Sequence, residues 1–264
     1  MRRAPRRFAV IDCEDREHWR GHERLWIDRL ARDGDEWRSY RAWAGELPDP
    51  AELDGAVVTG SHHSVIDPEL VWLAPLFRFL RESVGAPRGP SVVGVCFGAQ
   101  ALARALGGRV GANRGGRFVF GAEQIALHPA FGARLGADGV GDALSILESH
   151  GECVLELPPG AELLAHSSSA AHEVFTVGDR ALAIQGHPEM TREIMVGRIL
   201  PALRESGRID PDREAAALAS MDRPLDSERV LGLIGRFLEG PDQVAGGRPR
   251  AGLPEARAPG RSDT

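Results

Sequence analysis

A short apolar run that ends between two glycines places the tightest constraint on how this chain can fold. Residues 91–95 read Ser-Val-Val-Gly-Val, Cys96-Phe97-Gly98 follows, and residues 99–106 form a helix-favouring run. The pattern predicts a buried strand, a tight turn at Cys96 and then a helix. Gly94 and Gly98 flank the turn, so the main chain can bend sharply there without bulky side chains crowding it.

Cys96 therefore occupies an unusual position. Hydrolases with a G-x-S-x-G segment present their nucleophile on a strand–turn–helix of this kind, and here a cysteine stands in the place of the serine. The free N–H groups and the dipole of a helix N-terminus favour thiolate over thiol. Free cysteine is also often no more than a small buried residue. The interpretation of Cys96 as a nucleophile thus depends on a base elsewhere in the chain.

A candidate base follows a second apolar run. Residues 182–186 read Leu-Ala-Ile-Gln-Gly, and His187-Pro188-Glu189 comes directly after them. A cysteine nucleophile needs a base, and the base needs a partner that orients it. His187 can take the thiol proton, Glu189 can hold the tautomer of the imidazole, and Pro188 stiffens the link between them. We therefore predict that Cys96, His187 and Glu189 form a catalytic triad.

These segments resemble the class I glutamine amidotransferase family, which hydrolyses the γ-amide of glutamine with a Cys–His–Glu triad. The resemblance is carried by residues 94–100 (Gly-Val-Cys-Phe-Gly-Ala-Gln) and 186–189 (Gly-His-Pro-Glu). Residues 57–61 (Val-Val-Thr-Gly-Ser) are similar to the family's oxyanion loop, and residues 149–152 (Ser-His-Gly-Glu) to its Ser-His-x-Asp segment. Together these matches cover roughly residues 8–200.

The resemblance also implies substrate contacts. Backbone N–H groups near Gly60 and Ser61, with that of Phe97, are expected to stabilise an oxyanion. Gln100 is expected to help bind substrate, and His150 to lie near the glutamyl group or to have a structural role. The chain departs from the family where many members have more glycine, at residues 62–65 (His-His-Ser-Val), and at Glu152, where aspartate is usual.

Alternating strand and helix signals predict an α/β fold with a mostly parallel open sheet and helices on both faces, like flavodoxin. The later strands predict an antiparallel extension, and three helices form the C-terminal end. The expected helix at residues 68–84 turns Leu70, Leu73, Ala74 and Phe77 to one face. The expected strands are 8–13, 37–43, 55–59, 91–95, 117–127, 145–147, 154–157, 162–166, 173–177 and 181–185; the other expected helices are 18–33, 99–106, 191–206, 212–221 and 227–238.

The sheet topology itself predicts where a site would lie. Ligands in open α/β sheets bind outside the carboxyl ends of the strands. Ser61, Cys96 and His187 each follow the end of a predicted strand. We therefore expect the three residues to meet at one edge of the sheet.

Composition narrows the classes of partner. The net charge of −6 argues against a nucleic-acid partner, and no run of about 20 apolar residues predicts a membrane span. The three separated cysteines suit a reducing cytoplasm better than a disulfide framework. No cysteine–histidine spacing indicates a metal site, so we expect neither metal nor cofactor. We predict a basic N-terminal extension (residues 1–7), one domain (8–239) and a disordered tail (240–264).

The expected activity is cysteine-dependent hydrolysis of a γ-glutamyl amide through a γ-glutamyl thioester, with release of glutamate. The layout is similar to free-standing γ-glutamyl peptidases, because three helices and a tail, rather than a synthetase, follow residue 189. Two alternatives stay open. In the first, the protein is a glutaminase subunit that delivers ammonia to a synthetase partner. In the second, it is a non-catalytic glutamyl-binding protein.

Overall fold

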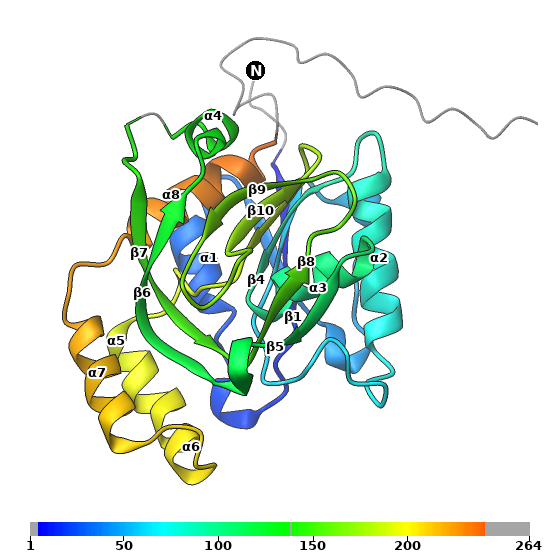
Figure 1. Ribbon diagram of the computed structural model, residues 1–264. Coiled ribbons are helices and arrows are strands. Elements are labelled where there is room, and N and C mark those ends of the chain that lie inside the picture. The colour runs from blue at the N-terminus through cyan, green and yellow to red at the C-terminus, as the bar shows by residue number, and fades with distance from the viewer. Residues whose placement is uncertain (1–4, 138, 241–264) are drawn as a thin grey trace, which may run out of the picture.

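A nine-stranded mixed sheet forms the centre of the computed structural model, which describes residues 5–137 and 139–240 (Figure 1). Its strands, in chain order, are β1 (Arg7–Asp12), β2 (Glu36–Arg41), β3 (Gly55–Val58), β4 (Ser91–Val95), β6 (Val119–Leu127), β7 (Ala143–His150), β9 (Ala161–His166), β10 (Val174–Val177) and β11 (Ala181–Ile184). They lie in the order β2-β1-β3-β4-β11-β10-β9-β6-β7. The five neighbouring strands from β2 to β11 in this spatial order are parallel to one another. The pairs from β11–β10 to β6–β7 are antiparallel.

Helices cover both faces of the parallel part, which confirms the predicted fold class. The helices are α1 (Arg24–Leu30), α2 (Leu73–Gly85), α3 (Phe97–Ala105), α4 (Ala130–Leu135), α5 (Arg192–Ile194), α6 (Leu200–Glu205), α7 (Pro211–Met221) and α8 (Ser227–Leu238). Alternate residues of each central strand face opposite layers. Val57 packs with the layer of α1 and α8, and Val58 packs with the layer of α2 and α3. Strands buried on both faces are continuous apolar runs for this reason.

Two predicted helices begin later than expected. The 18–33 segment contains a short 3-10 turn (Glu17–Trp19) and then α1, because Gly21 adopts a φ of 83° between them. The 68–84 segment becomes helical only at Leu73. Its buried face carries Leu73, Leu76, Phe79 and Leu80. Of the residues expected on one face, Leu73 is buried and Leu70 and Phe77 pack partly buried against the same core, whereas Ala74 is exposed.

The structure differs from the prediction at several further elements. The helix predicted at 191–206 is divided into α5, a π-helical turn (Met195–Ile199) and α6, because Pro201 at the start of α6 has no N–H to continue an α-helical ladder. The strand expected at 154–157 is β8 (Glu152–Glu156), and it leaves the main sheet to pair with β5 (Arg109–Ala112), which was not predicted. Helix α4 was also missed, and β7 extends beyond both ends of the strand predicted at 145–147.

The structure describes only part of the two terminal segments that were predicted, residues 1–7 and 240–264. Strand β1 already begins at Arg7, and Pro5 and Arg6 before it are described; residues 1–4 of the predicted extension and nearly all of the predicted tail lie outside the described residues. Among the helices that the structure describes, none has the length and apolar character needed to cross a membrane.

Candidate active site

Cys96 sits on a strained bend between β4 and α3. Its φ of 52° makes it the one non-glycine residue with positive φ in the described parts of the chain. The Cys96 N–H donates to the carbonyl of Ile184 at 2.8 Å, and the Cys96 carbonyl accepts from the N–H of Gln100 at 3.0 Å. Such strained main-chain geometry persists only where the surroundings hold it in place, and it is common at functional sites.

The glycines on either side of Cys96 are required by close main-chain contacts. A Cβ atom at Gly94 would lie 2.3 Å from the carbonyl oxygen of Gly98, and the main chain of Gly98 in turn packs on β3. The predicted tight turn is therefore present, and its glycines allow the strand, the bend and the helix to lie against one another.

His187 and Glu189 follow β11, the parallel neighbour of β4. The His187 Nδ1–H donates to Glu189 Oε1 at 2.8 Å, and the His187 N–H donates to the Leu147 carbonyl at 2.7 Å. Both side chains are buried. Burial alone would lower the pKa of His187, but the Glu189 carboxylate and the Cys96 sulfur raise that pKa well above its ordinary value. The site therefore favours a protonated imidazole beside the sulfur.

The loop after β3 brings Gly60 to the same place. A Cβ atom at Gly60 would lie 3.0 Å from His187 Cε1 and 3.8 Å from Cys96 Cβ. Within the described residues, the N–H groups of Gly60 and Ser61 have no protein acceptor. The N–H of Phe97 lies in the first turn of α3, where no intrahelical acceptor exists. In the part of the chain that the structure describes, the N–H groups of these three residues are thus not used by acceptors of the protein itself.

Gln100 and His150 line the same cleft but already have protein partners. The Gln100 amide donates to the Glu152 carbonyl at 2.8 Å and to Gln185 Oε1 at 3.2 Å. His150 Nδ1 lies 3.0 Å from the Glu152 carbonyl and 3.1 Å from Asn113 Oδ1. Burial lowers the pKa of His150 to about 4, which keeps the ring neutral. The His150 ring is thus occupied by contacts within the cleft wall, to the Glu152 carbonyl and to Asn113.

The other two thiols are buried elsewhere. Burial raises the pKa of Cys13 well above its ordinary value and also raises the pKa of Cys153. The Cys13 thiol contacts the Ile11 carbonyl at 3.6 Å. Of the three cysteines, only Cys96 lines the cleft that contains His187 and Glu189.

That cleft has a volume of about 850 Å³, at the upper end of the range usual for small-molecule sites. It extends from Cys96 past the loops after β1 and β3 to α6 and α7, which lie at one end of the molecule in Figure 1. Sequence reasoning missed much of its lining. The missed charged residues are Glu14, Arg16, Arg117, Arg198, Arg208 and Arg213.

Comparison with known proteins agrees with this architecture. Residues 54–201 match the family described as glutamine amidotransferase class-I. The chain belongs to the class I glutamine amidotransferase family.

Several members of this family are similar over most of their length. "Gamma-glutamyl peptidase 5" of Arabidopsis thaliana is 33% identical over 83% of this chain and 88% of its own length. "Gamma-glutamyl peptidase 4" of the same plant is 30% identical over 82% of this chain and 86% of its own. A glutamine amidotransferase structure from Thermotoga maritima, 20% identical, superimposes with a TM-score of 0.69 over 93% of this chain and 100% of its own, which supports the fold.

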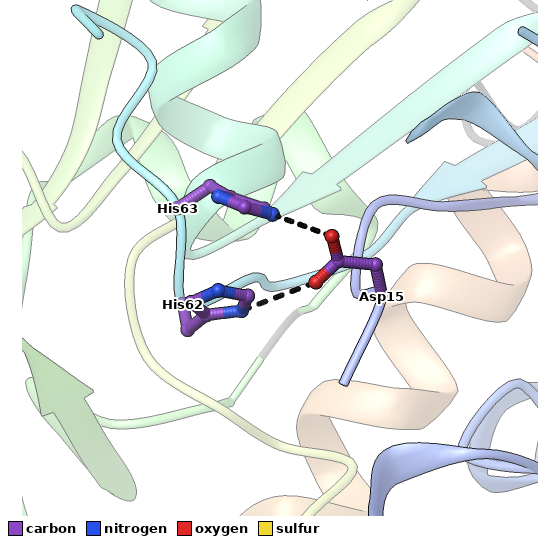
Figure 2. A group of neighbouring side chains, drawn as sticks. All are labelled: Asp15, His62 and His63. Atoms are coloured by element: carbon purple, nitrogen blue, oxygen red, sulfur yellow. Dashed lines mark ion pairs between the residues drawn. The ribbon is translucent and has the colours of Figure 1, made fainter. Parts of the chain in front are cut away.

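Two histidines, His62 and His63, line the cleft of this amidotransferase-family protein. Figure 2 shows both rings directed toward the Asp15 carboxylate. His62 Nδ1 lies 2.7 Å from Glu14 Oε1 and 3.8 Å from Asp15 Oδ1, and His63 Nε2 lies 3.2 Å from Asp15 Oδ2. Carboxylates from the loop after β1 therefore fix both rings. The sequence around His62 and His63 did not indicate that Glu14 and Asp15 would be their partners.

Among the described residues, three groups of side chains have metal-ligating atoms close together, within 4.8 Å in each group. Each group combines histidine with at least one carboxylate, and in each group a histidine lies within 3.5 Å of a carboxylate oxygen. The expectation that the protein uses no metal stays a prediction. The groups are Asp15, His62 and His63; Asp12, His22 and Glu23; and Glu148, His150 and Glu173.

Glu148 is a buried acid that sequence reasoning did not identify as part of this region. It is fully buried, and neither carboxyl oxygen has a hydrogen-bond partner among the described residues. A Cβ atom at Gly186 would lie 2.3 Å from Glu148 Oε1, so the acid lies directly against the residue before His187. Burial, reinforced by Glu173, raises the pKa of Glu148 well above its ordinary value. The one indication of Glu148 in the sequence was an acidic residue directly after the strand predicted at 145–147.

Proposed function

We propose that this protein hydrolyses γ-glutamyl amide bonds through a γ-glutamyl thioester on Cys96. The observation that carries the proposal is the thiol on a strained bend beside the hydrogen-bonded His187–Glu189 pair. The relatives named gamma-glutamyl peptidases support the same chemistry, since they match over most of both chains. The enzyme is thus of the glutamine amidotransferase-like hydrolase type.

The first half of the reaction transfers the glutamyl group to sulfur. The Cys96 thiolate attacks the γ-carbonyl carbon, and a carbon–sulfur bond forms. The oxyanion accepts hydrogen bonds from the N–H groups of Gly60 or Ser61 and of Phe97. When the carbon–nitrogen bond breaks, protonated His187 gives its proton to the leaving amine.

The second half restores the enzyme. A water molecule attacks the thioester carbonyl, and His187 takes a proton from that water. The carbon–sulfur bond breaks, glutamate leaves and the Cys96 thiolate forms again. Glu189 holds the imidazole in one orientation through both halves. In sum, one amide and one water give glutamate and a free amine.

The second candidate is a glutaminase subunit that supplies ammonia to a synthetase. One observation favours it: a Bordetella parapertussis protein named "GMP synthase [glutamine-hydrolyzing]" is 32% identical over 69% of this chain and 35% of its own length. The hydrolase is the stronger candidate because the peptidase relatives match along 86% and 88% of their own lengths. A reducing cytoplasm suits a thiolate enzyme of either kind.

The test measures glutamate release from purified protein incubated with glutamine, γ-glutamylethylamide and γ-glutamylglycine. We expect the wild-type protein and the Cys153→Ala variant to release glutamate, and the Cys96→Ala variant to release none. If glutamine turns over only after a synthetase partner is added, the subunit function is correct instead. Binding of these ligands without any turnover would identify a non-catalytic glutamyl-binding protein.

A further inference from the structure

The cleft carries positive charge that the protein itself does not neutralise. Arginines extend around its lining from the loop after β1 to the region of α6 and α7. Within the described residues, none of these arginines forms an ion pair with aspartate or glutamate, whereas some arginines elsewhere on the surface, such as Arg41 and Arg109, do so. The cleft arginines are Arg16, Arg117, Arg198, Arg208 and Arg213.

The acidic residues of the lining are already engaged. Glu14 accepts from His62, and Glu189 accepts from His187. Glu152 accepts from the Ser64 hydroxyl at 2.8 and 3.0 Å. The chain as a whole has a net charge of −6, so an excess of arginine in one cleft runs against its overall balance. A concave site with one sign of charge attracts ligands of the opposite sign.

Most of these cations are held in place by groups without charge. The guanidinium of Arg198 lies 5.3 Å from the ring centre of Trp19, and that of Arg208 lies 5.7 Å from the ring centre of Phe118. Arg213 donates to the backbone carbonyls of Phe118 and Arg208. An aromatic face fixes a guanidinium while leaving N–H groups at its edge free to bind an anion.

We propose that this arginine wall, defined as Arg117, Arg198, Arg208 and Arg213, binds an anionic group on the amine portion of the substrate. The inference rests on the proposed function. The reacting γ-carbonyl must lie at Cys96, so the group bonded to the γ-nitrogen extends into the rest of the same cleft. The substrate class is a γ-glutamyl conjugate of an amine that carries carboxylate or phosphate, such as a γ-glutamyl peptide with a free C-terminus. Conjugates of cationic amines are disfavoured.

The test compares substrates that share the glutamyl group and carry amine portions of different charge. γ-Glutamylethylamide is neutral, γ-glutamylglycine has one added carboxylate, γ-glutamylaspartate has two, and γ-glutamylputrescine has an added cation. A fifth substrate, γ-glutamyl aminomethylphosphonate, distinguishes a phosphate-like group from a carboxylate. We expect kcat/KM to be at least tenfold higher for the anionic conjugates than for the ethylamide, and lowest for the putrescine conjugate.

Substitutions then locate the selectivity. Arg117→Gln and Arg198→Gln should each lower kcat/KM for γ-glutamylglycine about tenfold, mainly through KM, and leave the ethylamide unchanged. Arg78→Gln is the matched control, because Arg78 is exposed on α2 and does not line the cleft. Equal losses for glycine and ethylamide conjugates would overturn the proposal, since the arginines would then serve the glutamyl group common to both.

A separate measurement keeps this inference apart from the proposed function. Calorimetric binding to the Cys96→Ala protein needs no turnover. Tighter binding of γ-glutamylglycine than of γ-glutamylethylamide, lost in the double variant Cys96→Ala, Arg198→Gln, supports the arginine wall even if no substrate is hydrolysed. Equal affinity for the two ligands contradicts it even if hydrolysis is observed.

Discussion

The main chain of Gly98 packs directly on the carbonyl oxygen of Val58, so that a Cβ atom at Gly98 would lie only 2.2 Å from that oxygen. Backbone on both sides leaves nothing that can move aside cheaply. We predict that Gly98→Ala lowers the free energy of unfolding by about 1–3 kcal/mol or more and displaces the bend at Cys96. Urea unfolding and glutamate release should both show the effect.

The control for this substitution is Gly85→Ala. Gly85 ends α2, its backbone φ is not in the left-handed region, and an added Cβ would meet nothing within 4 Å. Gly85→Ala should be neutral or slightly stabilising. If the two substitutions have equal effects, the contact between Gly98 and β3 does not set the geometry of the bend.

The three cysteines should differ in reactivity toward iodoacetamide. Cys96 lines the cleft, whereas burial raises the pKa of both Cys13 and Cys153. We expect alkylation of the folded protein to modify Cys96 first and to abolish glutamate release in parallel, as peptide mass spectrometry with activity sampling would show. Activity that disappears while Cys96 stays unmodified would contradict its role as the nucleophile.

The base and its partner should contribute unequally. His187→Ala should reduce kcat/KM by about 10³-fold or more, comparable to the loss of Cys96, because members of such a triad act as a unit. Glu189→Gln should be milder, since the imidazole can still accept a proton when its neighbour is an amide. His166→Ala, an exposed histidine on β9, is the control and should leave the rate unchanged. Full activity in His187→Ala would require a different base.

The stability of the protein should decrease as the pH rises above neutrality. Burial raises the pKa of Glu173 from its ordinary 4.5 to about 8, so between these values the native state holds a proton that the unfolded state has lost. His150 has the opposite effect on stability, because its pKa falls from 6.5 to about 4 and its contribution is lost as the pH drops below 6.5. The two trends oppose each other below 6.5. Above it, the raised pKa values of Glu173 and of its buried neighbour Glu148 both make stability fall as the pH rises.

We therefore expect the free energy of unfolding to fall between pH 6.5 and 8 by up to about 1.4 kcal/mol per pH unit from Glu173. The raised pKa of His187 acts in the same direction. Urea unfolding at several pH values measures the slope. Glu173→Gln should flatten it, whereas Glu69→Gln, at an exposed position, should not. An unchanged slope in Glu173→Gln would show that Glu173 does not titrate in this range.

Two central strands are among the elements that the sequence predicted well. Strands β3 and β4 fall within one residue of the prediction because every side chain in them is buried, which leaves an unbroken apolar signal. Strand β5 was missed because only Val110 among its four residues is buried. It is ordered through pairing with β8, a partner distant in sequence.

The candidate site divides in the same way. Strand ends predicted that Ser61, Cys96 and His187 would converge, and the structure places all three around one cleft. The arginine wall could not be predicted, because its members come from separate segments between residues 117 and 213 and none belongs to a recognisable motif. Only the folded chain shows that they share a cavity.

The parallel pairing of β4 with β11 places Val95 opposite Ile184. Val95 directly precedes Cys96, and Ile184 lies three residues before His187. A single ladder of main-chain hydrogen bonds thus fixes the spacing between sulfur and imidazole. The arginine wall lies on segments outside this ladder. Changes there can therefore alter which amine the protein releases while the reacting groups keep their positions, and libraries confined to the arginine wall offer a direct way to redirect selectivity.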